Sequence, residues 1–111
     1  MKFRKITAIV RLERTEPVKK RLKAIHVPGV SCAEVNGYGE YADYYSPDWQ
    51  VTHARFEIFV EASRCDEIVT AIMDEARTGV TGDGIVAVLP VEQLYHVRSG
   101  EALGTDEGEN P

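Results

Sequence analysis

Cysteine is scarce in this sequence, long apolar runs are absent, and no surplus of positive charge is present. Only two cysteines, Cys32 and Cys65, occur among 111 residues, which suits a reducing cytoplasm better than a disulfide-stabilised secreted fold. No apolar run approaches the roughly 20 residues that a membrane-spanning helix needs, and no signal peptide precedes the first expected strand. We therefore expect a soluble, cytoplasmic protein.

Acidic residues outnumber lysine and arginine. The chain has 13 Lys and Arg against 18 Asp and Glu, a formal net charge of −5, whereas a general nucleic-acid binder normally carries a basic surplus on one face. The basic residues of 19–23 fit a solvated helix face, and the acidic residues of 101–111 predict a flexible tail. We expect one domain over 1–100 that binds no nucleic acid, is not embedded in a membrane and associates with copies of itself.

Hydrophobic alternation with a period of two predicts the strands. Apolar residues alternate over 5–12 and 55–61, and a weaker pattern covers 30–36. Residues 85–89 are apolar at every position, as in a central strand or in one that another subunit covers. Pro90 should mark the edge or the end of that strand.

Apolar residues recur at helical spacing in two places, each behind a candidate capping residue. Thr15 would cap a first helix that ends near His26. Ser63 and Asp66 form a capping-box pattern before the second helix. A short segment over 94–98 can pair once more near the end of the chain.

The order of these elements is β-α-β, a long loop, β-α-β and a short terminal strand. This is the split βαβ, ferredoxin-like arrangement, so we predict an α+β fold with an antiparallel sheet. Two helices would cover one face of the sheet. The other face must find cover elsewhere, and self-association would supply it.

Glycines concentrate between the second helix and the last apolar run. Three of them fall within 79–84 and free the backbone for positive φ, so that its N–H groups could form an anion-binding concavity for phosphate. The alternative is a helix C terminus with Gly79 in the αL conformation, followed by a tight turn into the strand. A second glycine pair within 37–39 and Arg98 near the chain's end favour phosphate binding.

The segment 40–52 lacks a sustained period and carries four aromatic residues. A loop of this length inside a compact domain is uncommon unless it is functional. Its aromatic rings suggest contact with a partner or ligand, or they attach the loop to its own scaffold or to a neighbouring subunit.

Three segments together resemble the PII signal-transduction superfamily. Residues 76–84 and 97–101 resemble its phosphate-binding B-loop and its arginine-containing C-terminal element, and residues 34–39 resemble the strand that opens its T-loop. The resemblance covers nearly the whole chain. It implies a homotrimer with a nucleotide site in each cleft between subunits, where a T-loop-like segment (40–53), a B-loop-like segment (79–84) and the C-terminal element meet.

Carried over position by position, the resemblance assigns residues to an adenine nucleotide. Gly82, Asp83 and Gly84 would offer backbone donors to phosphate, and Arg98 would pair with it bidentately. Ser31 could hydrogen-bond the edge of the adenine. The other positions assigned to this nucleotide-binding site are Ile9, Gly29, Val30, Gly37, Tyr38, Gly39, Phe59 and His96.

Positive charge is missing where triphosphate-binding members of the family carry it. Val80 and Ile85 stand in place of two lysines, and His96 replaces one of two arginines. Because a hydrogen bond to a charged group contributes roughly 1.5–3 kcal/mol, we predict that AMP or ADP binds in preference to ATP. His96 and His53 could restore part of the charge near neutral pH.

The long loop departs from the nitrogen-regulatory members of the family as well. It is shorter, it lacks their modified-tyrosine motif, and Tyr41 occupies the nearest equivalent of the glutamine on which 2-oxoglutarate binding depends. These departures resemble the PII-like branches linked to inorganic carbon, including carboxysome-associated members, for which bicarbonate is an implied signal. The candidate bicarbonate-binding residues are Gly39, Glu40, Tyr41, His53 and Arg98.

The resulting interpretation is a regulator, not an enzyme, that signals to an unidentified transporter, enzyme or carboxysome component. A nitrogen-regulatory protein that responds to ATP and 2-oxoglutarate is the first alternative. A trimeric divalent-metal-binding protein would use the histidines or cysteines, which lie at no recognised ligand spacing, so we expect no metal site. A nucleotide hydrolase would rely on Glu40, Asp43 or Asp48, which a mobile loop holds poorly.

Overall fold

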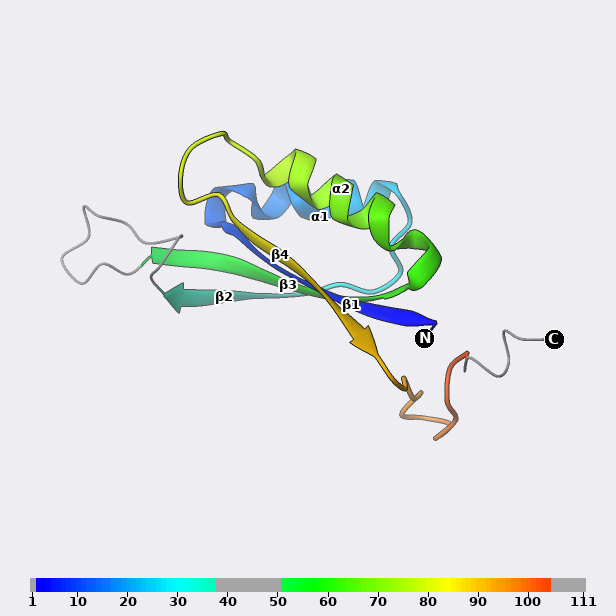
Figure 1. Cartoon of the computed structure of the whole chain (residues 1–111). Helices are drawn as coiled ribbons and strands as arrows, with labels where there is room; N and C mark the ends of the chain where they lie inside the picture. Colours follow the sequence, from blue (N-terminus) through cyan, green and yellow to red (C-terminus); the bar gives the residue numbers. More distant parts are fainter. Residues whose placement is uncertain (1, 38–50, 105–111) are drawn as a thin grey trace.

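The computed structural model describes residues 2–37 and 51–104. Within them the chain forms a four-stranded antiparallel sheet in the order β2-β3-β1-β4, with two α-helices lying across it (Figure 1). The predicted α+β, ferredoxin-like fold is confirmed. The elements are β1 (Phe3–Arg11), a 3₁₀ helix η1 (Leu12–Arg14), α1 (Thr15–Ala24), β2 (Ser31–Gly37), β3 (Val51–Glu61), a 3₁₀ helix η2 (Ala62–Arg64), α2 (Cys65–Ala76) and β4 (Gly84–Val91).

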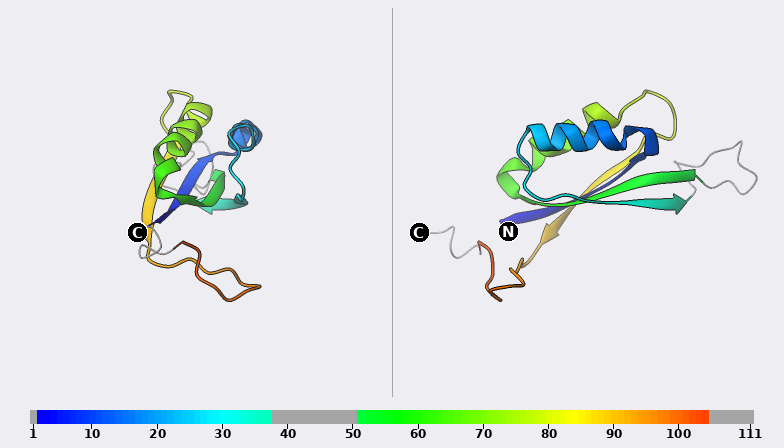
Figure 2. Two further views of the ribbon diagram at one scale, coloured as in Figure 1. Left: turned by 90° about the vertical axis from the view of Figure 1, so that its right-hand side faces the viewer. Right: turned by 180° about the vertical axis from the view of Figure 1, so that it is seen from behind.

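One face of the sheet packs against both helices (Figure 2). Alternate residues of β1 and β3 reach this face because side chains change sides at every position along a strand. The helices turn their apolar stripes toward the same face. The largest fully buried side chains are Phe56, Ile6, Leu22, Ile58, Ile68, Ile72, Val10 and Val18.

The opposite face of the sheet carries large apolar side chains that stay exposed in the single chain. Phe59, Ile85 and Leu89 are 48%, 46% and 44% exposed. Ile9 pairs with Ile85, and Lys5 pairs with both Phe59 and Leu89 across the sheet. We call the surface formed by Ile9, Phe59, Ile85 and Leu89 the open face, because neither helix covers it (Figure 2).

β4 lies at one edge of the sheet beside β1. The expectation of a central strand for this apolar run is therefore wrong, and cover by another subunit is the remaining explanation for its exposed side chains. Pro90 lies inside β4, as expected for proline in an edge strand, where the missing N–H costs little.

Both helices begin differently from the prediction. Thr15 and Ser63 do not cap them: Thr15 lies in the first turn and donates its hydroxyl to the Leu12 carbonyl at 2.6 Å, and Ser63 lies within η2. The residues at the N-cap positions are Arg14 and Arg64, which form no side-chain cap. A 3₁₀ turn leads into each helix, and its first carbonyl accepts a hydrogen bond from the first backbone N–H of the helix. The Thr15 N–H donates to the Leu12 carbonyl, and the Cys65 N–H donates to the Ala62 carbonyl.

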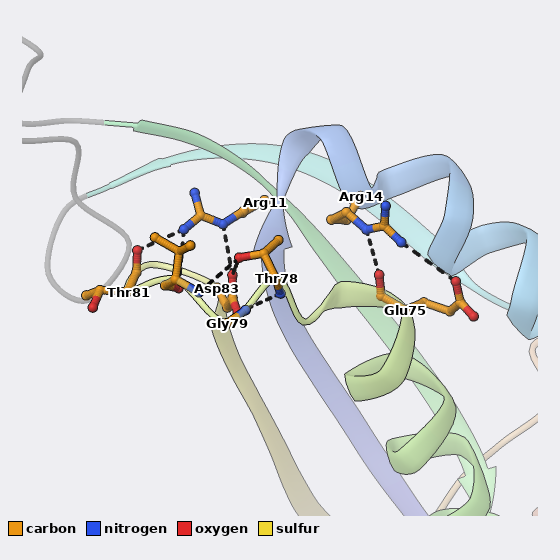
Figure 3. Close-up of polar contacts among 8 residues, drawn as sticks. Arg11, Arg14, Glu75, Thr78, Gly79, Thr81 and Asp83 are labelled. Atoms are coloured by element: carbon orange, nitrogen blue, oxygen red, sulfur yellow. Dashed lines mark hydrogen bonds and ion pairs between the residues drawn. The ribbon is translucent and has the colours of Figure 1, made fainter.

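The two N-cap arginines instead reach the C terminus of the other helix. Arg14 Nε donates to the Glu75 carbonyl at 2.6 Å (Figure 3), and Arg64 donates to the Ile25 and His26 carbonyls at 2.7 and 3.2 Å. The last carbonyls of a helix have no partner within the helix and carry partial negative charge. Each helix start therefore stabilises the end of its neighbour.

Two further boundaries differ from the prediction. β3 begins at Val51, so residues 51–53 of the expected T-loop-like segment belong to the sheet, and the described segment starts there. The segment 94–98 adds no strand to the sheet among the described residues; it forms an isolated bridge between Tyr95 and Ala102. In the described ranges no helix is long and apolar enough to cross a membrane.

Candidate functional site

The glycine-rich loop leaves α2 at Ala76 and enters β4 at Gly84. Arg77 is already extended (φ −70°, ψ 128°), whereas Gly79 and Gly82 have φ of +87° and +103°. Gly79 therefore lies beyond the helix end and does not cap it, so the helix-cap interpretation of this glycine is wrong. Positive φ is the conformation that favours glycine, which explains both positions.

Gly84 is required for a different reason. Its φ is +109°, and a Cβ at this position would lie 1.8 Å from the Ile9 carbonyl oxygen. The loop closes onto the start of the β1–β4 pairing here, opposite Val10. Only a residue without a side chain allows this approach of the two backbones.

Asp83 is the centre of the loop's hydrogen bonding (Figure 3). Its Oδ2 accepts the backbone N–H groups of Thr78 and Gly79 at 2.8 and 2.9 Å, and its Oδ1 accepts the Thr78 hydroxyl and Arg11 Nε, the latter at 2.9 Å. The Thr78 hydroxyl above all, then Arg11 and the two N–H groups, hold the pKa of Asp83 well below its usual range. The carboxylate is therefore charged and fixed inside the loop.

Arg11, the last residue of β1, holds the same loop from the side of the sheet. Besides its ion pair with Asp83, it donates through Nη2 to the Thr81 carbonyl at 2.8 Å and to the Val80 carbonyl at 3.4 Å (Figure 3). These contacts turn two loop carbonyls toward the guanidinium. Sequence reasoning missed Arg11, which gave no local signal beyond ending a strand.

The hydrogen bonds within the loop divide it into a first half, 78–80, and a second half, 81–84. The N–H groups of Thr78 and Gly79 serve Asp83, and the N–H of Val80 points to the Thr78 hydroxyl at 3.2 Å. An external anion would therefore have to bind to the second half, 81–84, where the predicted donors Gly82, Asp83 and Gly84 lie.

Three of the expected adenine-side residues, Ile9, Ser31 and Phe59, lie on the same side of the sheet. Ile9 and Phe59 belong to the open face, and Ser31 pairs with Glu57, two residues from Phe59 on the same strand. Gly29 and Val30 precede β2 and are exposed. Gly37 ends β2 opposite Val51. The predicted positions Tyr38, Gly39, Glu40 and Tyr41 lie outside the described residues.

Arg98 and His96 lie at the opposite end of the sheet from the glycine loop. β4 pairs Gly84 with Val10 at one end and Val91 with Phe3 at the other, a span of roughly 24 Å at 3.4 Å per residue. The segment 94–103 follows Val91, and Gly104 lies so close to the start of β1 that a Cβ built on it would be 2.5 Å from Lys2 Cδ. The segment that contains Arg98 therefore lies far from the glycine-rich loop within a single chain, as the path of the chain after β4 shows (Figure 1).

His53 is a buried residue of the sheet, whereas the bicarbonate prediction requires it to contact a ligand from the loop. It lies in β3, opposite Arg11, and is only 2% exposed. Arg98, the other cation proposed for bicarbonate, is exposed at the far end of the molecule. In the part of the chain that the structure describes, no three His, Cys, Asp or Glu side chains gather as metal ligands would.

A split βαβ sheet with a glycine-rich loop between its second helix and its last strand defines the class of protein. The family model described as "Nitrogen regulatory protein P-II" matches residues 3–101. The chain belongs to this PII family and is a signalling protein of that family.

Relatives from plants and archaea support the assignment. The "Nitrogen regulatory protein P-II homolog" of Arabidopsis thaliana is 35% identical over 108 residues, 90% of this chain and 55% of that protein. "Nitrogen regulatory protein P-II 1" of Methanothermobacter thermautotrophicus is 35% identical over 106 residues, 89% of this chain and 92% of that protein. The chain thus spans little more than half of the plant relative's length and most of the archaeal one's.

A solved structure shows the same fold. The crystal structure of Arabidopsis thaliana PII bound to citrate has a TM-score of 0.78 and 38% sequence identity, and the match covers 91% of this chain and 88% of that chain.

Proposed function

We propose that this chain is a cytoplasmic, homotrimeric PII-type regulator that binds an adenine nucleotide in each cleft between subunits. AMP or ADP is preferred to ATP, and bicarbonate acts as a second effector. The segment 40–53 passes the signal to a protein partner, which is a transporter, an enzyme or a carboxysome component.

The observation that carries the proposal is the separation of the loop from Arg98. A phosphate held by the second half of the loop still needs a cation, and the chain's own Arg98 lies roughly a strand's length away. A neighbouring subunit seated on the open face supplies both missing parts: it covers Phe59, Ile85 and Leu89, and it brings its own C-terminal segment toward the loop. Val97, beside Arg98, is 99% exposed in the single chain.

The preference for fewer phosphates follows from the loop's composition. Val80 and Ile85 carry no charge, and Arg11 is already paired with Asp83. Arg98 is then the cation that reaches the phosphates from the neighbouring subunit, with the His96 side chain two residues away from it in the sequence. Arg98 compensates one or two phosphate groups better than three.

Bicarbonate is a small planar anion that needs a few converging N–H donors and a cation. Because His53 is buried in β3, we assign Arg98 as the cation that binds bicarbonate. The N–H donors that we assign to bicarbonate are the backbone of Gly39 and its neighbours Glu40 and Tyr41. The Arabidopsis thaliana PII structure is bound to citrate, so one member of the family takes up a small carboxylate anion.

Calorimetric titration of AMP, ADP and ATP, each with and without bicarbonate at fixed pH and ionic strength, tests the proposal. AMP or ADP should bind tightest, and bicarbonate should change that affinity, since linked sites alter each other's affinities. Tightest binding of ATP with 2-oxoglutarate would identify a nitrogen regulator instead, as the names of the relatives suggest. No nucleotide binding would contradict the proposal.

Mixed trimers test whether the site is shared between subunits. Arg98→Gln removes the cation and Gly82→Ala strains the loop, so each variant alone should bind AMP at least about tenfold more weakly. When the two variants are co-assembled, about a quarter of the clefts combine an intact loop with an intact Arg98 and should bind as wild type does. Failure to recover tight binding would place both groups in one chain's site.

A further inference from the structure

We propose that Asp83 and Arg11 form a specificity-determining pair. The Asp83 carboxylate occupies an anion-binding position within the loop and neutralises Arg11, so that the loop offers a nucleotide only uncharged backbone donors. The inference deepens the proposed function and rests on it. It concerns how the loop chooses among phosphate chains of different charge.

Asp83 occupies the kind of position that a bound anion takes. Two backbone N–H groups, a hydroxyl and a guanidinium converge on its carboxylate (Figure 3). Proteins offer this set of donors to phosphate or carboxylate ligands. The first half of the loop is therefore already filled, and an external phosphate does not enter it.

Arg11 donates to the same loop through two of its three guanidinium nitrogens. Nε bonds to Asp83, and Nη2 bonds to the Thr81 and Val80 carbonyls. The ion pair is partly shielded, since the side chains of Arg11 and Asp83 are 24% and 25% exposed. The guanidinium thus positions the loop, while its charge is cancelled before a nucleotide arrives.

Because Asp83 neutralises Arg11, the number of phosphates on the nucleotide should affect how tightly the loop binds it. Arg77 is the other cation near this site; it directly follows α2, ahead of the segment 78–85, and its side chain is exposed. Within 78–85 no lysine or arginine is present. Each added phosphate therefore brings negative charge to the segment 78–85, whose net charge together with Arg11 is zero. Removing the charge of Asp83 should release Arg11 and favour the more highly charged nucleotide.

Asp83→Asn is the test, with the ratio of the ATP and AMP dissociation constants as the readout. Asparagine keeps a carbonyl oxygen for the Thr78 and Gly79 N–H groups but loses the charge. We expect the ratio Kd(ATP)/Kd(AMP) to fall about tenfold or more relative to wild type. Asp66→Asn removes the same charge at the far end of α2 and should leave the ratio unchanged.

Arg11→Gln gives the opposite change and keeps the inference testable if Asp83→Asn folds poorly. The substitution leaves the Asp83 carboxylate negatively charged and unpaired, close to the bound phosphates. The ratio Kd(ATP)/Kd(AMP) should therefore rise. If both variants weaken AMP, ADP and ATP by equal factors, the pair is merely structural and the inference is overturned. If the wild-type protein binds none of the three nucleotides, the proposed function itself fails, which is a different result.

Discussion

Gly84 is a position at which the backbone conformation and its surroundings require glycine. Alanine there combines a φ of +109° with a Cβ 1.8 Å from the Ile9 carbonyl oxygen, and strain of this kind costs about 1–3 kcal/mol before any displacement of β1. We expect Gly84→Ala to lower the free energy of unfolding by about 2–4 kcal/mol in urea denaturation.

Two other glycines provide matched controls for this prediction. Gly79 has φ +87° but nothing within 4 Å of the point that a Cβ would occupy, and Gly29 has open space without a strained φ. Gly79→Ala should cost about 1 kcal/mol, and Gly29→Ala should cost close to nothing. A cost for Gly84→Ala no larger than that for Gly79→Ala would show that the contact with Ile9 does not matter.

Asp83 should make stability sensitive to acid. Its pKa in the folded protein lies well below the usual 3.8 because of Thr78, Arg11 and the loop N–H groups. A carboxyl whose folded pKa is depressed contributes stability that is complete above the unfolded pKa and is lost as the pH falls below it. We expect the free energy of unfolding to fall more steeply below about pH 4 in wild type than in Asp83→Asn, and parallel curves would contradict this.

At the scale of elements, the helices hold each other through Arg14 and Arg64. Arg64 donates to two carbonyls at the end of α1 and also pairs with Glu67 at 2.7 Å, while Arg14 donates to the end of α2. Arg64→Ala and Arg14→Ala should each lower the free energy of unfolding by about 1–2 kcal/mol. Lys20→Ala, on the exposed side of α1, is the control and should have little effect on the thermal midpoint.

The same arginines explain where local reasoning about elements failed. Thr15 and Ser63 have the side chains of capping residues, yet a 3₁₀ turn precedes each helix and moves its start. Hydrophobic periodicity located both helices correctly because it depends on neighbours three or four positions apart. The caps depend on how β1 and β3 deliver the chain over the sheet, which no short window contains.

At the scale of the whole molecule, the open face is the surface on which the proposed trimer would assemble. Leu89→Asp places a charge on this face, where Leu89 is 44% exposed in the single chain, so the subunit should still fold while association fails. We expect wild type to sediment as a species three times the 12.4 kDa subunit and Leu89→Asp as a monomer without nucleotide binding.

Met73→Asp is the matched control for the trimer prediction. Met73 is a similarly exposed apolar residue, 38%, but it lies on α2, on the helix side of the sheet. A wild-type protein that sediments as a monomer would remove the support for sites shared between subunits. Dissociation by Met73→Asp alone would place the interface on the helices.

The sequence by itself determined the order of the first four strands and the two helices, the place of Pro90 near the end of the last of these strands and the position of the glycine-rich loop. Periodicity and glycine spacing are local properties of a chain. Only the tertiary structure decided that Arg11 holds Asp83, that His53 is buried and that Arg98 lies a strand's length from the loop. Arg11 and Asp83 stand 72 residues apart, and such partners become neighbours only after the sheet has paired β1 with β4. Contacts of this kind depend on the register of the whole sheet, which leaves no pattern in either local segment.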